Sequence, residues 1–198
     1  MSTVFNFTFV PWFRAVAPYI HMHRGKTFVV GVVGEAIAAG KLAAIATDLA
    51  LIQSMGVRIV LVHGFRPQVN EQLRAKGHEP RTSHGLRITD EVALDSAQEA
   101  AGQLRYEIEA AFSQGLPNTP MAGSKVRVIS GNFLTARPMG IIDGVDFKHT
   151  GVVRKVDVAG IRRSLDSGAL VLLSPFGFSP TGEGFNLAME EVVTSVAT

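Results

Sequence analysis

The stretch that most constrains the fold of this chain is FVVGVVGE, at positions 28–35. Its apolar run is broken only by Gly31 and carries no charge before Glu35. An uninterrupted apolar run is typical of a strand covered on both faces of a mainly parallel sheet. Gly31 indicates a close approach of other atoms, and Gly34 permits a tight turn. The G-x-x-G spacing matches neither the dinucleotide-binding nor the P-loop pattern, so the simplest interpretation is an ordinary buried strand and turn.

The remaining chain alternates predicted strands and helices, which favours a parallel sheet between two helix layers. Further buried strands are predicted at 57–64 and 169–175, and helices at 41–55, 66–76, 91–114, 157–167 and from 187. Glycines and prolines punctuate residues 125–156 and predict β-hairpins that stand off the parallel sheet. The other connections are expected to be a hairpin or loop at 78–89, a loop at 116–124 and a glycine-rich loop at 176–186.

Ligands of open parallel sheets bind beyond the carboxyl ends of the strands. The loops that follow the predicted strands are therefore the candidate ligand loops. They are Gly34–Gly40, His63–Arg66 and Ser174–Asn186.

Residues 8–24 form the second constraining pattern, an amphipathic helix that precedes the first strand. Phe9, Trp12, Phe13 and other apolar residues recur at spacings of three and four, which places them on one face. Such an aromatic face packs either on its own domain or on a partner subunit. We therefore divide the chain into an N-terminal helical extension, 1–25, and one domain, 26–198.

Composition excludes several classes of protein. The chain has 198 residues, which is enough for one domain with a core. Its 19 basic and 17 acidic residues are nearly balanced, so no nucleic-acid partner is expected. There is no cysteine, which excludes disulfides and thiolate chemistry and fits a reducing compartment. No signal peptide or membrane-spanning stretch is recognised, so we expect a cytoplasmic protein without a membrane partner.

Five segments in order carry a resemblance to a known family: APYIHMHRGKTFVV, VRIVLVHGFRPQVN, HGLRITD, SGNFLTARPMGIIDGVDFKHTGVVRKVD and LLSPFGFSPTGEGFNL. From about Pro18 onward, the chain resembles the amino-acid-kinase fold. Within that fold it is most similar to the kinase-like N-terminal domain of bacterial N-acetylglutamate synthases, relatives of acetylglutamate kinase. The resemblance implies a three-layer α/β/α sandwich with a mainly parallel sheet and a β-hairpin excursion.

The resemblance also implies which active-site groups are present. Acetylglutamate kinases carry a lysine in the first strand that stabilises the transferring phosphoryl group, and Gly31 stands at that position. The kinase glycine pair after the second strand is reduced to Gly64 followed by Phe65. Arg87 matches the kinase arginine that holds the substrate carboxylate, and Asn186 matches a later asparagine of that pocket. Losing the lysine removes positive charge that phosphoryl transfer needs, so no catalytic residue is assigned.

The last matching position is Glu190, where the kinases carry an aspartate. The amino-acid or carboxylate pocket implied by the resemblance therefore comprises Gly64, Arg87 and Asn186. We expect no metal site, because His21 and His23 lie two apart on a helix and no cysteine or carboxylate cluster accompanies them.

In the synthases and in arginine-sensitive kinases, a similar N-terminal helix interlaces subunits. The resemblance therefore implies a homo-oligomer, with Tyr19 as a contact for the feedback effector arginine. No acetyl-CoA loop of the GNAT acetyltransferases is found, so no cofactor is expected in this chain. Acetyl-CoA would be the substrate of an acetyltransferase domain or subunit outside it. We expect the chain to be a fragment, a truncated product or one piece of a split enzyme.

Three functions follow as hypotheses. The first is a regulatory and oligomerising domain of N-acetylglutamate synthase, in arginine biosynthesis, that itself transfers neither acetyl nor phosphoryl groups. The second is a true amino-acid kinase whose catalytic lysine is displaced to Lys26 or Lys41. The third is a stand-alone module that senses an amino acid. Whether this chain alone is an enzyme is left open by the sequence.

Overall fold

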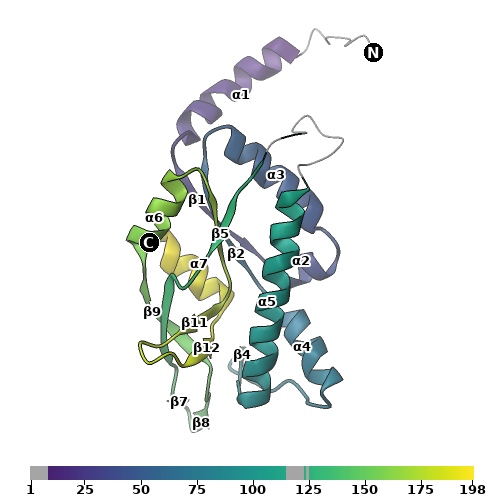
Figure 1. The fold of residues 1–198 in the computed structure, drawn as a ribbon, viewed down its shortest axis with the longest axis vertical. Helices are drawn as coiled ribbons and strands as arrows, with labels where there is room; N and C mark the ends of the chain where they lie inside the picture. Colours follow the sequence, from purple (N-terminus) through teal and green to yellow (C-terminus); the bar gives the residue numbers. More distant parts are fainter. Residues whose placement is uncertain (1–8, 115–122, 124) are drawn as a thin grey trace.

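The structure is a computed structural model and describes residues 9–114, 123 and 125–198. Its centre is a four-stranded sheet in the order β1-β2-β10-β5, of which β1, β2 and β5 are labelled in Figure 1. All three pairings in this sheet are parallel. The strands are β1 (Thr27–Val32), β2 (Arg58–His63), β10 (Leu170–Leu173) and β5 (Val128–Ser130). The predicted parallel sheet is therefore confirmed.

Helices cover both faces of this sheet because its strands are apolar on both sides. Ile59 and Leu61 of β2 point into one apolar cluster, and the alternating Val60 and Val62 point into another. The first cluster also holds α3 (Leu42–Ser54), α4 (Arg66–Ala75) and α5 (Glu91–Ser113). The second holds α6 (Val158–Asp166) and α7 (Met189–Ala197). The three-layer α/β/α arrangement is confirmed.

The first strand is less buried than its sequence predicts. Only Val32 of β1 is fully buried, because β1 lies at the edge of the central sheet among the described residues. Both faces are nevertheless covered. Val30 packs toward α3 and α5, and Val29 packs toward α7. The prediction of helices on both faces was correct, and the prediction of a fully buried strand was wrong.

A second four-stranded sheet stands beside the first and contains both parallel and antiparallel pairs. Its order is β12 (Gly184–Asn186), β11 (Phe176–Phe178), β6 (Leu134–Pro138) and β9 (Gly151–Val156). Between β6 and β9, the strands β7 (Ile141–Ile142) and β8 (Val145–Asp146) form a hairpin. The predicted hairpin excursion is present, except that β5 joins the parallel sheet.

Two short elements replace loops that the sequence predicted. Residues 176–186 are a hairpin of β11 and β12, because Phe176 and Phe185 anchor its strands against the core. Residues Gly34–Ala38 form a short helix, α2, where only a loop was expected. The segment 78–89 contains the expected hairpin, formed by β3 (Thr82–Ser83) and β4 (Leu86–Arg87). The loop predicted at 116–124 lies outside the described residues apart from Gly123.

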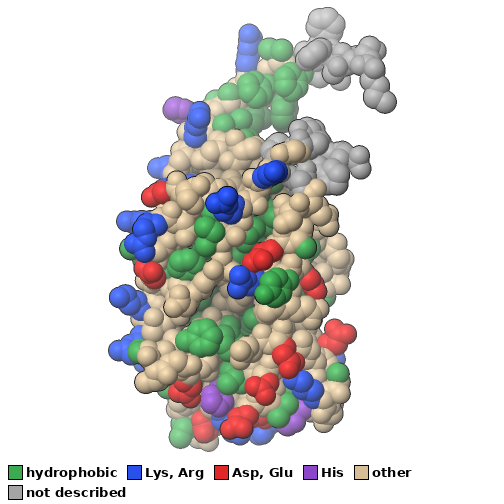
Figure 2. All heavy atoms as spheres, in the orientation of Figure 1, with side chains coloured by type: hydrophobic (Ala, Val, Ile, Leu, Met, Phe, Trp, Pro, Cys, Tyr) green, Lys and Arg blue, Asp and Glu red, His purple; other side chains and the backbone are tan. Residues whose placement is uncertain are grey.

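Helix α1 (Phe9–His23) projects from one end of the domain (Figure 1). None of its residues is buried, and its apolar side chains are visible along its surface in Figure 2. Trp12 is 60% exposed, and Phe9 and Phe13 stack on each other with ring centroids 5.9 Å apart. The aromatic face of the helix therefore does not pack on its own domain, which was one of the two expected arrangements. At the base of the helix, His23 packs edge-on against Phe28 of β1, with ring centroids 5.3 Å apart. No helix within residues 9–114 or 125–198 is long and apolar enough to cross a membrane.

Candidate functional site

The candidate site is a cavity of about 250 Å³ at the carboxyl ends of β1 and β2. This is the edge at which open parallel sheets bind ligands. Several separate segments meet around it. The lining residues are Val33, Gly34, Glu35, Gly64, Phe65, Arg66, Leu86, Arg87, Thr150, Pro175, Asn186, Leu187, Ala188, Met189 and Glu190.

Two glycines let the backbones behind the cavity come together. A Cβ atom added to Gly64 would lie 2.9 Å from the Gly34 nitrogen, which is too close for any side chain. A Cβ atom added to Gly34 would lie 2.8 Å from Pro67. Gly64 also donates its N–H to the Val32 carbonyl over 2.7 Å. Both turns must therefore be glycine if β1 and β2 are to end side by side at the cavity.

Arg87 reaches the cavity from the β3–β4 hairpin. Its Nη2 atom donates to Asn70 Oδ1 on α4 over 2.6 Å, which fixes the guanidinium. Its Nη1 atom is buried and has no hydrogen-bond partner among the described residues. Burial lowers the pKa of Arg87, and the nearby charge of Arg66 lowers it further. A cation held under these conditions favours an anionic ligand.

Asn186 belongs to a buried chain of hydrogen bonds. Its amide nitrogen donates to the Thr89 hydroxyl over 3.0 Å, and the hydroxyls of Thr89 and Thr150 lie 2.8 Å apart. Thr150 in turn donates to the Arg87 carbonyl oxygen. This chain ties the end of β12 to the end of β4. Asn186 and Arg87 therefore hold a fixed relative position.

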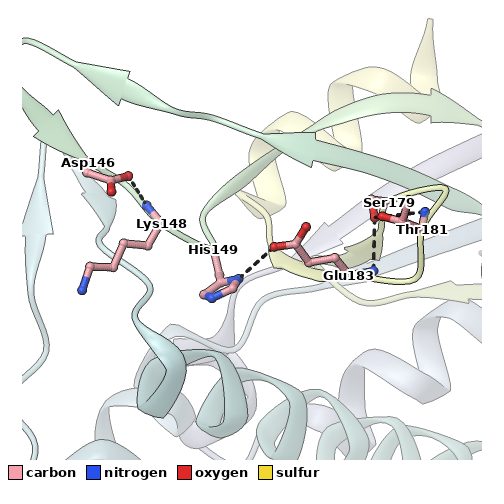
Figure 3. A network of polar contacts seen from close by, with 6 residues as sticks. All are labelled: Asp146, Lys148, His149, Ser179, Thr181 and Glu183. Carbon is pink, nitrogen blue, oxygen red and sulfur yellow. Dashed lines mark hydrogen bonds and ion pairs between the residues drawn. The ribbon is translucent and has the colours of Figure 1, made fainter.

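A neighbouring polar network braces the segments that carry Thr150 and Asn186 (Figure 3). The imidazole of His149 faces the Glu183 carboxylate, with Nδ1 and Oε1 3.6 Å apart. Ser179 Oγ accepts the backbone N–H of Glu183 over 3.1 Å, which closes the β11–β12 turn. The His149 carbonyl then accepts the N–H of Asn186 over 2.9 Å. These contacts explain how a glycine-rich segment holds a precise position.

The space beside Gly31 is filled by another element. A Cβ atom on Gly31 would lie 3.0 Å from Val193 Cγ2 and 3.7 Å from Met189 Cε, both on α7. No lysine is among the described residues that line the cavity. Phe65 is buried in the core and also lines the cavity.

His63 lies at the end of β2 but not in the cavity lining. It is completely buried, and its Nε2 atom lies 2.7 Å from Ser174 Oγ. Its Nδ1 atom lies 3.3 Å from the Gly64 carbonyl oxygen. Burial lowers the pKa of His63 to about 4, although the hydrogen bond to Gly64 opposes this shift. The ring is therefore neutral at pH 7 and acts as a hydrogen-bonded core residue.

The sequence analysis named three pocket residues, and the fold brings Gly64, Arg87 and Asn186 to one cavity. Tyr19 is 63% exposed on α1 and does not line it. Thr150 also lines the cavity, although it lies outside the three candidate ligand loops. Its position becomes evident only from the pairing of Thr150 with Asn186 between the two segments.

Other possible chemistry is limited within the described residues. No group of three or more His, Asp or Glu side chains there is arranged to hold a metal ion. Lys26 immediately precedes β1, at the opposite end of that strand from the cavity. Six strand residues separate the two ends, or roughly 20 Å. Lys41 precedes α3 and is also absent from the cavity lining.

The sequence pattern of the Amino acid kinase family matches residues 26–198. The chain belongs to this family.

Among its members, the chain is similar to bacterial acetyltransferases. It is 60% identical over 190 residues to an amino-acid acetyltransferase of Ralstonia nicotianae, covering 96% of this chain and 42% of that protein. It is 53% identical over 189 residues to an amino-acid acetyltransferase of Ectopseudomonas mendocina, covering 96% and 44%. The chain therefore spans less than half the length of these curated relatives.

A solved structure shares the fold over nearly the whole chain. N-acetylglutamate synthase from Neisseria gonorrhoeae, complexed with coenzyme A and L-arginine, superimposes with a TM-score of 0.88 at 43% identity. The match covers 96% of this chain and 44% of that one. Carbamate kinase from Giardia lamblia has a TM-score of 0.60 at 15% identity, which shows a common fold only. The resemblance to the kinase-like domain of N-acetylglutamate synthases is confirmed.

Proposed function

We propose that this chain is the kinase-like regulatory and oligomerising domain of an N-acetylglutamate synthase in arginine biosynthesis. The parent protein transfers the acetyl group of acetyl-CoA to L-glutamate, giving N-acetyl-L-glutamate. The acetyl transfer takes place in a GNAT-type domain or subunit outside this chain. Acetyl-CoA is therefore a substrate of that part, and this domain needs no cofactor of its own. The protein works in the cytoplasm.

The observation that carries this proposal is a glycine at position 31, with the space beside it occupied. Phosphoryl transfer requires positive charge around the transferring group. At Gly31, the space a lysine would enter is bounded by Val193 and Met189. Within residues 9–114 and 125–198, no lysine lines the cavity, and Lys26 lies at the far end of β1. A kinase fold without its lysine fits a role in regulation and assembly.

The test measures both reactions on the purified 198-residue chain. We expect no ATP-dependent phosphorylation of N-acetyl-L-glutamate and no acetyl transfer from acetyl-CoA to L-glutamate. Adding the separately expressed acetyltransferase part should restore an acetyl transfer that responds to arginine. Phosphoryl transfer that is lost in Lys26→Met or Lys41→Met would instead support the displaced-lysine kinase.

We assign two partners to the extension that ends at residue 25. Helix α1 joins copies of this chain into a homo-oligomer, and Tyr19 contacts arginine when it acts as the feedback effector. Both assignments are supported by the exposed aromatic face of α1 and by the similarity to a synthase solved with L-arginine. In the parent enzyme, Tyr19→Ser should weaken inhibition by arginine and leave kcat without arginine unchanged. Unchanged inhibition would reject this role for Tyr19.

A second candidate function is a stand-alone amino-acid sensor. It is favoured by the cavity, in which a fixed arginine has a buried nitrogen without a hydrogen-bond partner among the described residues. In this function Gly64, Arg87 and Asn186 form the pocket for a ligand carboxylate. Calorimetry of the isolated chain with arginine, glutamate and N-acetylglutamate tests it. Absence of heat with all three would leave assembly as the role of the domain.

A further inference from the structure

The cavity carries charges of both signs. Its lining contains two arginines, Arg66 and Arg87, and two glutamates, Glu35 and Glu190. In the part of the chain that the structure describes, no lysine or aspartate lines it. A pocket for a purely anionic ligand gains nothing from two carboxylates, since like charges repel in a partly enclosed site. The presence of both positive and negative charges therefore constrains the ligand more than the arginines alone do.

The basic side of the cavity suits a carboxylate. The Nη2 atom of Arg87 is held by Asn70 at 2.6 Å, and its buried Nη1 atom has no partner among the described residues. A guanidinium offers charge-assisted hydrogen bonds to a carboxylate. The Phe65–Arg66 turn at the start of α4 also lines the cavity, and no side chain caps that helix. A carboxylate is thus favoured near Arg87 and the N-terminus of α4.

The acidic side of the cavity suits an ammonium group. Glu35 lies in α2 after β1, and Glu190 lies in the first turn of α7. Neither carboxylate forms an ion pair or a side-chain hydrogen bond with another residue in the described part of the chain. Both therefore remain available as acceptors. An ammonium group donates three hydrogen bonds and has the complementary charge.

We propose that this cavity binds a free α-amino acid as its zwitterion and discriminates against the N-acylated form. The ligand carboxylate lies toward Arg87, and the ligand ammonium lies toward Glu35 and Glu190. This assignment rests on the proposed carboxylate pocket and adds its specificity. N-acylation removes the ammonium charge and leaves a net anion facing two carboxylates.

The size of the cavity fits this class of ligand. Its volume of about 250 Å³ lies just below the range of roughly 300–1,000 Å³ that is usual for drug-sized ligands. A single amino acid suits such a space better than a nucleotide does. Leu86, Leu187 and Met189 give part of the lining an apolar character, which suits the aliphatic part of an amino-acid side chain.

The test uses three matched pairs of ligands with the full 198-residue chain. The pairs are L-glutamate, L-glutamine and L-leucine, each with its N-acetyl derivative, titrated by calorimetry at about pH 7.5. In at least one pair, the free amino acid should bind ten-fold or more tightly than its N-acetyl derivative. Arg87→Gln should weaken binding of that free amino acid at least ten-fold.

The decisive variant neutralises the acidic side. Glu35→Gln combined with Glu190→Gln removes both charges and keeps similar side-chain shapes. The preference for the free amino acid should fall to less than three-fold, chiefly because the free form binds more weakly. Glu191→Gln is the matched control, since Glu191 lies next to Glu190 on α7 but does not line the cavity. Glu191 accepts the Val153 N–H over 2.8 Å, and the glutamine oxygen can still accept it. This control should retain the ten-fold preference.

Each outcome separates this inference from the proposed function. Equal or tighter binding of the N-acetyl form in every pair would overturn the zwitterion assignment and leave a carboxylate pocket. Binding of none of the six compounds would overturn both this inference and the pocket. Unchanged discrimination in the double glutamine variant would also overturn the inference. The regulatory function is tested independently by the turnover assays, and phosphoryl transfer by this chain would reject it whatever the cavity binds.

Discussion

At the scale of single residues, the proposed absence of phosphoryl transfer rests on Gly31. We predict that Gly31→Lys gains no ATP-dependent activity. We also expect a loss of about 1 kcal/mol of stability, because a Cβ atom there would lie 3.0 Å from Val193 Cγ2. Valine in a helix is nearly fixed in one rotamer and does not yield easily. Urea unfolding and an ATP-turnover assay measure both effects.

Combining Gly31→Lys with Val193→Ala tests whether Val193 causes the loss of stability. When Val193→Ala is already present, adding Gly31→Lys should cost less than it does in the wild type, because the blocking methyl group is gone. Measurable ATP turnover in Gly31→Lys would show that this one position decides whether the domain has kinase activity. Unchanged stability would show that α7 moves aside without cost.

His63 gives a prediction with a defined pH range. Its pKa falls from the ordinary 6.5 to about 4 in the folded chain, so the unfolded chain binds the proton first as the pH is lowered. The neutral ring contributes fully to the free energy of unfolding above about pH 6.5, and this contribution is lost as the pH falls toward 4. The total loss is about 3 kcal/mol at roughly 1.4 kcal/mol per pH unit.

We therefore expect His63→Gln to show a flatter dependence of unfolding free energy on pH, between about pH 7.5 and about pH 5, than the wild type. The glutamine side chain can still place a nitrogen near Ser174 but cannot titrate. His21→Gln is the control, since His21 is exposed on α1, and its slope should match the wild type. Parallel curves for His63→Gln and the wild type would contradict the buried, neutral histidine.

At the scale of elements, the start of α5 depends on one side chain. Asp90 accepts the Ala93 N–H over 3.0 Å and lies 3.1 Å from His78 Nε2. Partial burial raises the pKa of Asp90, but the Ala93 hydrogen bond and His78 outweigh it and hold the pKa below its usual value. Asp90→Ala should cost about 1 kcal/mol, measured by urea unfolding at neutral pH. Asp90→Asn keeps a capping oxygen and should lose clearly less, and equal losses would reject the capping role.

The elements also show how far the sequence alone could predict this structure. Strands such as β2 were predictable because apolar runs and β-branched residues are local signals. The edge position of β1 was not, because it depends on which strands lie beside it. The β11–β12 hairpin was taken for a loop, since its glycines outnumber the phenylalanines that anchor it. Helix α2 is only five residues long and has too little periodicity to detect.

The candidate site was likewise only partly predictable from the sequence. Arg87 and Asn186 came from motifs that follow the same order along the chain as in the family it resembles, and the fold brings both to one cavity. The close approach of Val193 to the Cβ position of Gly31 joins residues distant in the sequence, and no local pattern encodes it. The same is true of Thr150, which reaches the cavity through pairing with Asn186. Long-range packing therefore determined what local patterns left open.

At the scale of the whole molecule, α1 is the element least supported by its own chain. It has 15 residues, none of them buried, and it contains Pro18. Isolated helices of this length are only marginally stable in water, and an internal proline weakens a helix further. Trp12 and Phe13 are nevertheless 60% and 48% exposed. Such a helix needs a packing partner, and we have proposed a second copy of the chain.

We predict that the purified chain is an oligomer and that Trp12→Ser combined with Phe13→Ser converts it to smaller species, because the variant loses the aromatic contacts between copies. Sedimentation velocity measures the mass, and circular dichroism should show a small loss of helix. The control is Tyr106→Ser, which removes an aromatic side chain that is 68% exposed on α5 and should leave the mass unchanged. An unchanged mass in the α1 variant would place the subunit contacts elsewhere. A monomeric wild-type chain would mean that α1 requires a different partner, such as the acetyltransferase part.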